Sequence, residues 1–438
     1  MGLAGLWTCL VLAGSVCLAT GDDQAQSGEG SRQESRKPSS PDAEPLFLTP
    51  LINNCSYEEA KLKSEVHLFK RYNITNASAY SGYITVNETT ESNLFFFFIE
   101  AENKDPNAPL MLWTPGGPGL SALFAMLLQN GPAQFSATGT LLRRELTIQK
   151  NMSVIYLDAP IGAGLSFTQN ISGFSTTMDE VTNDIVTFLD QFLQLFNNCR
   201  GRDFYAGGDS YAARYSVALA YKMLTEPSKV DLKLQGVIGG VGFLAPIVDL
   251  ADSSDFLLQN SMLDTKGYAA FKQTFAIIEF LAAQKNISAV FLLLQTIFTS
   301  ETKKTLFQEL TLYNSHASPL YTERPLPMLW SFHCANQSSF KRAIHAGENA
   351  TIEYANETLI FMLAGDWLED ITGKVEYVLN RTRVLFYTGQ LDALFPSTKL
   401  QAHFEKLNWT HADEYRAANR TLWKPYPDLQ TPFGTSLP

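Results

Sequence analysis

Alternating apolar and polar positions mark the first strands of this chain. Residues 81–87 (SGYITVN) and 93–100 (NLFFFFIE) combine alternation with a high aromatic content. Such segments are typical of half-buried strands, and the short polar link between them predicts an antiparallel pair. The apolar run at residues 108–115 (APLMLWTP) predicts a buried strand next to this pair.

Further short apolar runs follow, and they are separated by helical segments. Strands are predicted at residues 154–160, 204–208, 235–243 and 383–392, with a helix over 178–196. Strands that alternate with helices imply an α/β fold, with a mostly parallel central sheet and helices on both faces. About residues 246–380 are helix-rich instead, which predicts a helical cap insertion between two late strands.

The N-terminal segment differs from the rest of the chain. Residues 3–19 are apolar and small, and a polar TGDD sequence ends this run. We expect a secretory signal peptide over residues 1–20; the alternatives, a buried helix or a membrane anchor, fit its short length less well. Residues 21–45 are polar and Ser-rich, which predicts a disordered linker before a single domain at 46–438.

Composition excludes several classes of protein. With 438 residues and 45% hydrophobic content, the chain can bury a large core, and disorder as its overall state is excluded. The net charge of −11 provides no basic field for phosphate backbones, so we expect no nucleic-acid partner. Cysteines and histidines form no zinc-type cluster, and we expect no metal or other cofactor.

N-glycosylation sequons are abundant, which indicates a route through the secretory pathway. Their thirteen positions are Asn54, Asn73, Asn76, Asn87, Asn151, Asn170, Asn286, Asn336, Asn349, Asn356, Asn380, Asn408 and Asn419. We therefore expect a glycoprotein that is secreted or resides in the lysosomal or endomembrane lumen. Cys55, Cys199 and Cys334 remain after signal removal and permit one disulfide at most.

The segment FYAGGDSYAARY (204–215) places Ser210 in a tight turn between a predicted strand and a predicted helix. A serine in such a turn is exposed above a helix N-terminus, as in a nucleophile elbow. Gly208 fits the Gly-x-Ser-x-Gly pattern, but Ala212 stands where that pattern has its second glycine. An ordinary helix-capping serine is the alternative interpretation.

Two further loops carry candidate chemistry. WTPGGPG (113–119) follows an apolar strand, and its glycines allow backbone amides to converge on an anion, as in an oxyanion hole. Asp392 follows the strand RVLFYTGQ and could orient a histidine. Taken alone, the first is also compatible with a simple turn and the second with a solvated carboxylate.

Five blocks together resemble the serine carboxypeptidase family: PLMLWTPGGPGLSALF, YLDAPIGAGLSF, GGDSYAARY, LQGVIGGVGF and VLFYTGQLDALFP. The flanking segments are most similar to its vitellogenic-like carboxypeptidase branch. The resemblance implies an α/β-hydrolase fold and removal of single residues from peptide C-termini at acidic pH. It implies Ser210 as nucleophile, Asp392 as triad carboxylate, and the amides of Gly117 and Tyr211 as oxyanion hole.

For the substrate's terminal carboxylate, the resemblance implies binding by Asp209 and by the loop at Gly116. The chain departs from the family here, since Pro115 replaces an asparagine that would donate hydrogen bonds. Asp209 is one methylene shorter than the family's glutamate. Ala213 replaces a glycine in the same motif. These changes shorten the reach of the carboxyl group at residue 209 and reduce the space around Ser210.

The family's catalytic histidine lies in a Gly-His-Pro-like segment beyond the triad carboxylate. No such segment follows Asp392 here, and we therefore expect a C-terminally truncated hydrolase. Among the histidines after Asp392, His403 is predicted on a helix surface and His411 in a loop or cap, and neither is expected in the triad. The histidines before Asp392 are expected in ordinary structural roles.

Two functions stay open from the sequence. The chain is a serine-type carboxypeptidase, as a shortened product or an incomplete record, or it is a catalytically impaired relative that binds peptides or proteins. Acyl transfer or ester hydrolysis at the same elbow is a third possibility, which also needs a base. The oligomeric state is not readable from the sequence.

Overall fold

The computed structural model describes residues 43–300, 303–352, 356–423 and 434–436. The expected signal peptide and nearly all of the expected linker lie outside the described residues. The expected division into signal, linker and one hydrolase domain therefore stays a prediction.

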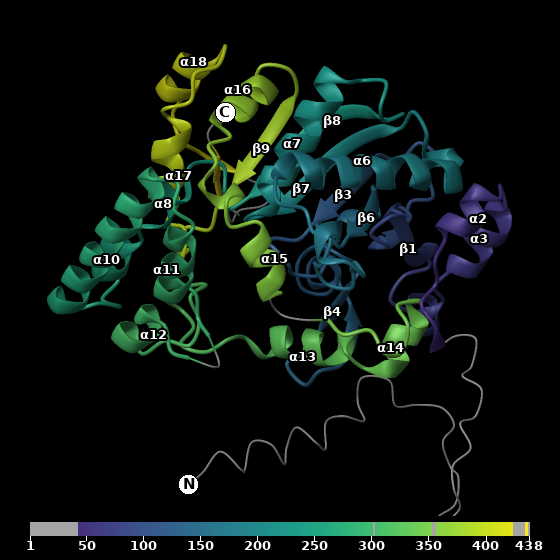
Figure 1. Cartoon of the computed structure of the whole chain (residues 1–438), viewed down its shortest axis with the longest axis horizontal. Helices are drawn as coiled ribbons and strands as arrows, with labels where there is room; N and C mark the ends of the chain where they lie inside the picture. Colours follow the sequence, from purple (N-terminus) through teal and green to yellow (C-terminus); the bar gives the residue numbers. More distant parts are fainter. Residues whose placement is uncertain (1–42, 301–302, 353–355, 424–433, 437–438) are drawn as a thin grey trace, which may run out of the picture.

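A seven-stranded sheet forms the centre of the molecule, in the order β1-β2-β6-β3-β7-β8-β9 (Figure 1). Its strands are β1 (Ala79–Asn87), β2 (Ser92–Ile99), β3 (Leu110–Thr114), β6 (Ser153–Leu157), β7 (Asp203–Asp209), β8 (Lys233–Gly240) and β9 (Arg383–Tyr387). β1 and β2 pair antiparallel, as does β2 with β6, and the pairs from β6 to β9 are all parallel. The predicted antiparallel pair and the mostly parallel α/β sheet are confirmed.

Side chains alternate between two hydrophobic clusters, one on each face of the sheet. Along β2, Phe96 and Phe98 belong to one cluster and Phe95 and Phe97 to the other, and all four are buried. A strand that is buried on both faces has a continuous run of apolar residues in its sequence, which explains the four consecutive phenylalanines.

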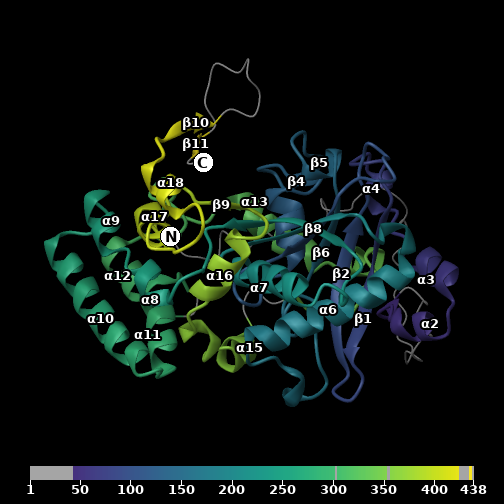
Figure 2. The same cartoon turned by 90° about the horizontal axis from the view of Figure 1, so that it is seen from above.

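Helices cover both faces of the sheet (Figures 1 and 2). The first face is packed by α6 (Met178–Leu195), α7 (Ala212–Thr225) and α16 (Thr372–Leu379). α6 begins with a capping box in which Thr177 and Glu180 bond each other's backbone amides, which fixes its start. The other face is packed by α5 (Ala122–Phe124), the π-helix η2 (Ala125–Gln129), α13 (Leu326–Ala335) and α14 (Ser338–Ala343).

Helices also fill the described chain between β8 and β9, and several of them extend away from the sheet in Figure 1. They are α8 (Ile247–Ala251), α9 (Ser254–Gln259), α10 (Thr265–Ala283), α11 (Ser288–Ile297), α12 (Leu306–Thr311), α13, α14, α15 (Glu357–Met362), the 3-10 helix η6 (Asp366–Leu368) and α16.

The remaining elements lie at the periphery of the sheet. They are α2 (Thr49–Asn53), α3 (Tyr57–Ser64), α4 (Leu68–Arg71), β4 (Ala133–Phe135) with β5 (Leu141–Arg143), η3 (Ile148–Lys150), η4 (Ile171–Gly173), η5 (Asn197–Cys199), α17 (Ser397–Phe404), α18 (Ala412–Ala417) and β10 (Thr421–Trp423) with β11 (Gly434–Ser436). Across the described residues, no helix combines the length and the hydropathy that a bilayer crossing requires.

Two details differ from or refine the sequence predictions. β9 ends at Tyr387, five residues before Asp392, so the predicted strand was too long at its C-terminal end. No disulfide joins any two of Cys55, Cys199 and Cys334, all of which lie in the described residues.

Candidate active site

Ser210 occupies a strained turn between β7 and α7. Its backbone has φ of 57°, in the left-handed region, and α7 begins two residues later at Ala212. Hydrogen bonds on both sides hold this conformation: Ser210 N donates to Gly240 O at 2.7 Å, and Phe243 N donates to Ser210 O at 3.1 Å. A non-glycine residue keeps this backbone conformation only where its surroundings enforce it, and here the two hydrogen bonds do so.

The Gly-rich loop reaches Ser210 because β3 and β7 are neighbours in the sheet, with Thr114 paired to Gly208. A Cβ atom on Gly116 would lie 2.7 Å from Asp209 O and 3.0 Å from Ser210 Cβ. Only glycine therefore fits at residue 116. Within the described chain, the amides of Gly117 and Tyr211 make no backbone hydrogen bond, which is a requirement for donors of an oxyanion hole.

A buried carboxyl group anchors the far end of this loop. Asp158, which follows β6, accepts hydrogen bonds from Ser121 Oγ, from Ala122 N at 2.5 Å and from Leu165 N at 2.7 Å. Burial raises the pKa of Asp158 to about 7, although these hydrogen bonds oppose the rise. Asp158 thus ties two loops together at the carboxyl ends of β3 and β6.

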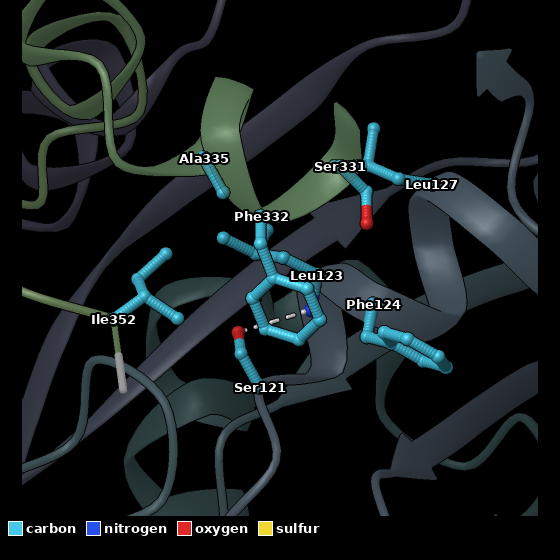
Figure 3. Close-up of a pocket in the computed structure, with 8 residues that line it drawn as sticks. All are labelled: Ser121, Leu123, Phe124, Leu127, Ser331, Phe332, Ala335 and Ile352. Carbon is cyan, nitrogen blue, oxygen red and sulfur yellow. Dashed lines mark hydrogen bonds between the residues drawn. The ribbon is translucent and has the colours of Figure 1, made fainter. Parts of the chain in front are cut away.

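Behind the loop the packing is tight. Figure 3 shows Phe332 of α13 above Leu123 and Ser121, whose hydroxyl accepts a hydrogen bond from Leu123 N. The cavity that they line measures about 10 Å³, which is the space of a single water. The residues that line this cavity therefore pack behind the loop, and the cavity itself is too small for a ligand.

Asp209, the residue before Ser210, is held by two side chains from distant parts of the sequence. Tyr387 Oη donates to Asp209 Oδ1 at 2.5 Å, and Gln129 Nε2 donates to Asp209 Oδ2 at 2.8 Å. Gly240 lies beneath this contact, and a Cβ there would come within 2.0 Å of Asp209 Oδ1. Burial raises the pKa of Asp209, while the two hydrogen bonds lower it in part.

Gln129 and Tyr387 did not figure among the sequence-predicted site residues. Tyr387 is the last residue of β9 and pairs with Gly240, which also pairs with Asp209. The alternation of side chains along the strands could therefore have placed Tyr387 and Asp209 on the same face of the sheet. Gln129 ends a π-helix, and its sequence carries no comparable signal.

Asp392 lies in the turn that follows β9. Its Oδ1 accepts hydrogen bonds from Leu394 N and Phe395 N, both at 2.8 Å, while Oδ2 makes no hydrogen bond within the described residues. Burial raises the pKa of Asp392 to about 6. The ring of Phe395 packs 6.0 Å from that of Phe243, whose amide binds Ser210 O. This contact connects the Asp392 turn with the elbow.

All six histidines lie in the described part of the chain, and none hydrogen bonds to Ser210 or Asp392. His316 precedes Ala317, whose carbonyl oxygen accepts a hydrogen bond at 3.5 Å from Ala393 N, the residue after Asp392. Its Nδ1 accepts from Thr299 N at 3.0 Å, so the ring proton is on Nε2 and that nitrogen is no proton acceptor. Burial lowers the pKa of His316 to about 4.

The other histidines have separate surroundings. His403 lies in α17 and is buried, with 9% of its surface exposed, so the prediction of a helix-surface position was wrong. α17 packs against α8, and His403 lies on the buried side of α17 together with Leu400. His411 precedes α18 and lies 2.9 Å from Glu414, in the predicted cap position. The remaining three are His67 beside Glu65, His333 beside Gln337 and His345 beside Ser81.

A buried polar network lies directly beneath the elbow. Tyr211 Oη donates to Asp366 Oδ2 at 2.5 Å, and Arg214 Nε lies 3.6 Å from the same oxygen. Arg214 is fully buried and also donates to the carbonyl oxygens of Asp366 and Glu369. This network connects Asp366 of η6 with Tyr211, the residue directly after Ser210.

The comparisons with known proteins agree with this arrangement. The family described as serine carboxypeptidase matches residues 71–431. The chain belongs to the serine carboxypeptidase family. It is 31% identical over 399 residues to the probable serine carboxypeptidase CPVL of Pongo abelii, covering 90% of this chain and 82% of that protein.

The venom serine carboxypeptidase of Apis mellifera is 30% identical over 384 residues, covering 86% of this chain and 81% of that protein. Among solved structures, the prohormone-processing carboxypeptidase Kex1(Δ)p from Saccharomyces cerevisiae superposes with a TM-score of 0.68. It shares 15% identity and covers 86% of this chain and 89% of its own, which shows the same fold. The α/β-hydrolase fold of this serine carboxypeptidase-like protein is therefore established.

Two of the three departures from the family pattern, at Asp209 and Ala213, are accommodated by local contacts. The shorter Asp209 is held by Tyr387 and Gln129. Ala213 is fully buried, and its methyl group packs beside Gly239 and Gly242. Pro115 follows the end of β3, where it supplies no side-chain donor. No three His, Cys, Asp or Glu side chains of the described segments gather where they could hold a metal ion.

Proposed function

We propose that this chain binds the C-terminal end of peptides at the Ser210 elbow and that Ser210 is the nucleophile that attacks the last peptide bond. The observation that carries this proposal is the left-handed Ser210 backbone beside the Gly116 to Gly117 segment, on the scaffold of a peptidase family. The amides of Gly117 and Tyr211 would then stabilise the oxyanion of the tetrahedral intermediate.

In the proposed reaction, Ser210 Oγ forms a bond with the carbonyl carbon, and the C–N bond to the last residue breaks. The hydroxyl proton passes to a base and from there to the leaving amine, and water then hydrolyses the acyl ester. Asp392 would orient and stabilise the base. No metal takes part in this scheme.

Asp209 would bind the terminal carboxylate of the peptide beside Gly116. Two carboxyl groups share a hydrogen bond only when one of them is protonated. Because burial raises the pKa of Asp209, its neutral form persists to higher pH than that of an exposed aspartate. The proposed site therefore favours acidic conditions, as expected for a protein that is secreted or lysosomal and glycosylated.

Two measurements on the purified chain test this function. An N-acylated dipeptide should bind more tightly than its C-terminal amide at mildly acidic pH, and hydrolysis should depend on Ser210. The Ser210→Ala variant is the control for hydrolysis and should still bind the dipeptide. Equal binding of acid and amide, together with equal hydrolysis by both proteins, would refute the proposal.

A further inference from the structure

Two N-glycosylation sequons meet at a groove that the proposed reaction does not use. The groove lies between the loop that contains η4 and the start of α15, and its volume is about 590 Å³. Asn170 lines it from the loop and Asn356 lines it from α15, although the two residues are far apart in the sequence. Small-molecule sites usually measure roughly 300 to 1,000 Å³, so this groove has room for a ligand.

The lining of the groove is mostly polar and suits a sugar. The side chains of Gln169, Glu357 and Thr358 form part of it, and within the described residues none of the three makes a hydrogen bond. A carboxylate accepts hydrogen bonds from hydroxyl and amide groups, while the amide and the hydroxyl can both donate and accept. Phe174 adds an aromatic ring, whose electron-rich face attracts the C–H groups of a sugar ring. This combination of groups is typical of carbohydrate recognition.

The loop from Thr168 to Phe174 is held in place by its own contacts. Thr168 Oγ1 donates to Thr90 O at 2.8 Å and accepts from Ser92 Oγ at 3.0 Å, which ties the loop to the start of β2. Phe174 packs on Gly162, where a Cβ atom would come within 2.5 Å of the ring. The groove is therefore pre-formed, and a ligand would lose little affinity to ordering this loop.

The two sequon asparagines differ in how their side-chain nitrogens are used. Asn170 is exposed, its Oδ1 accepts from Ser172 N and Ser172 Oγ, both at 3.0 Å, and its Nδ2 makes no hydrogen bond within the described residues. Asn356 Nδ2 donates to Gly162 O at 3.1 Å, and its Oδ1 accepts from Leu359 N at 3.1 Å. Because an N-glycan is attached through Nδ2, Asn170 suits attachment, whereas Asn356 has a structural role.

We propose that Asn170 carries an N-linked glycan and that the first sugars of this glycan lie in the groove, between the η4 loop and α15. Attachment forms a bond from Asn170 Nδ2 to the anomeric carbon of a lipid-linked oligosaccharide diphosphate. The bond from that carbon to the diphosphate breaks, and one Nδ2 proton leaves with the lipid diphosphate. Ile171 is 66% exposed beside the attachment point, and the glycan would cover it.

A glycan in this position would hold two parts of the chain together near the Gly-rich loop. Asn356 forms one wall of the groove, and a Cβ atom on Gly119 would lie 3.6 Å from Asn356 N. The inference requires the expected passage through the secretory pathway. It is independent of Ser210 and of the proposed reaction.

Glycopeptide mass spectrometry tests the attachment, on the full chain expressed in cultured animal cells. We expect a glycan on Asn170 and an unmodified Asn356. In gel electrophoresis, Asn170→Gln should migrate faster by the mass of one glycan. An unmodified Asn170 in the unaltered chain overturns the proposal. A glycan on Asn356 in place of Asn170 also overturns it, because that wall of the groove would then be displaced.

Protection of the glycan in the folded chain tests its place in the groove. Asn286 is the matched control, since its sequon is also Asn-Ile-Ser, it is exposed, and its Oδ1 accepts from Ser288 N at 3.0 Å. Peptide N-glycosidase, which cleaves the bond to Nδ2, should act on Asn170 more slowly than on Asn286 by roughly 10-fold, which corresponds to about 1.4 kcal/mol of contacts. After denaturation the two rates should be equal. Equal rates in the folded chain overturn the place in the groove.

A change in the opposite wall of the groove completes the test. Glu357→Ala keeps the Asn356 sequon and removes an exposed carboxylate from the first turn of α15, so release from Asn170 should become several-fold faster. Glu309→Ala, at an exposed position in the first turn of α12, is the control and should change nothing. An unchanged rate in Glu357→Ala, or the same acceleration in both variants, overturns the place in the groove. The comparison within the unaltered chain survives if a variant fails to fold, and no readout depends on Ser210.

Discussion

Tyr387, the last residue of β9, donates a hydrogen bond to Asp209, the last residue of β7, across Gly240 of the intervening strand. The contact joins an edge strand to the residue before the proposed nucleophile. Gln129 holds the second oxygen of the same carboxylate. Asp209 is thereby fixed beside Ser210 despite a side chain one methylene shorter than glutamate.

We predict that binding of a peptide with a free C-terminus weakens as the pH rises through the pKa of Asp209. Burial raises this pKa, so Asp209 is neutral at low pH and donates a hydrogen bond to the peptide carboxylate. Above the pKa the two carboxylates repel each other. Titration calorimetry over a pH series with an acyl-dipeptide measures the effect.

The control for this prediction is Asp209→Asn, in which the pH dependence should disappear because the amide does not titrate. Tyr387→Phe removes a donor that stabilises the ionised form, so the midpoint should move to higher pH. An unchanged midpoint in Tyr387→Phe would show that this hydrogen bond does not govern Asp209.

A second prediction concerns Gly116→Ala. The added methyl group would lie 2.7 Å from Asp209 O and 3.0 Å from Ser210 Cβ, so the loop must move away from the elbow. Misplacing one oxyanion donor costs about 100-fold to 1,000-fold in turnover. We expect a loss of that order in the Ser210-dependent hydrolysis of an acyl-dipeptide. Gly373→Ala on α16 is the control, since its methyl group meets no atom within 4 Å; a comparable loss there would contradict the prediction.

The elements of this site differ in how far the sequence alone could predict them. The elbow and the Gly-rich loop are local features, because strand, turn and helix signals follow one another within a dozen residues around Ser210. The strands were predicted for the same reason, since continuous apolar runs such as the one in β2 are recognised without knowledge of their partners.

The contacts to Asp209 could not be predicted in this way. Gln129 and Tyr387 come from segments 80 and 178 residues away, and only the folded sheet brings them together. His403 was placed on the wrong side of its helix because α17 has little amphipathic pattern and its buried face is decided by packing against α8. Similarly, nothing in the sequence pairs Arg214 with Asp366.

A third prediction follows from Asp158, whose pKa is about 7 in the folded chain and 3.8 without the fold. Between these two pKa values Asp158 is protonated in the folded state and ionised in the unfolded state. Its contribution to the free energy of unfolding therefore decreases as pH rises from about 4 to about 7. In Asp158→Asn this contribution should be absent. Urea unfolding of both proteins across this range measures the difference in slope, and parallel curves would contradict the raised pKa. A constant offset is expected as well, because the amide cannot accept all of the original hydrogen bonds.

The buried pair of Arg214 and Asp366 gives a fourth prediction. Asp366→Ala leaves the fully buried Arg214 without its anion and Tyr211 Oη without its acceptor. Breaking a buried pair on one side typically lowers the free energy of unfolding by about 3 to 5 kcal/mol. Urea unfolding measures this loss. Glu369→Ala, which removes the exposed partner of Lys285, is the control and should change stability little. A similar small change in both variants would show that the buried pair is dispensable.

The fifth prediction concerns the exposed apolar side chains of β9, the edge strand of the described sheet. Leu385 is 56% exposed and Tyr387 is 43% exposed, on the same face of the strand. Edge strands with exposed apolar residues promote association between molecules, and a charged side chain suppresses it. Leu385→Lys should therefore raise the monomeric fraction in size-exclusion chromatography and the yield in culture medium. Leu62→Lys, at a 73% exposed position on α3 away from the sheet edge, is the matched control and should have a smaller effect. Equal effects of the two lysines would assign the gain to charge alone, and monodisperse, abundant unaltered protein would show that this face does not promote association.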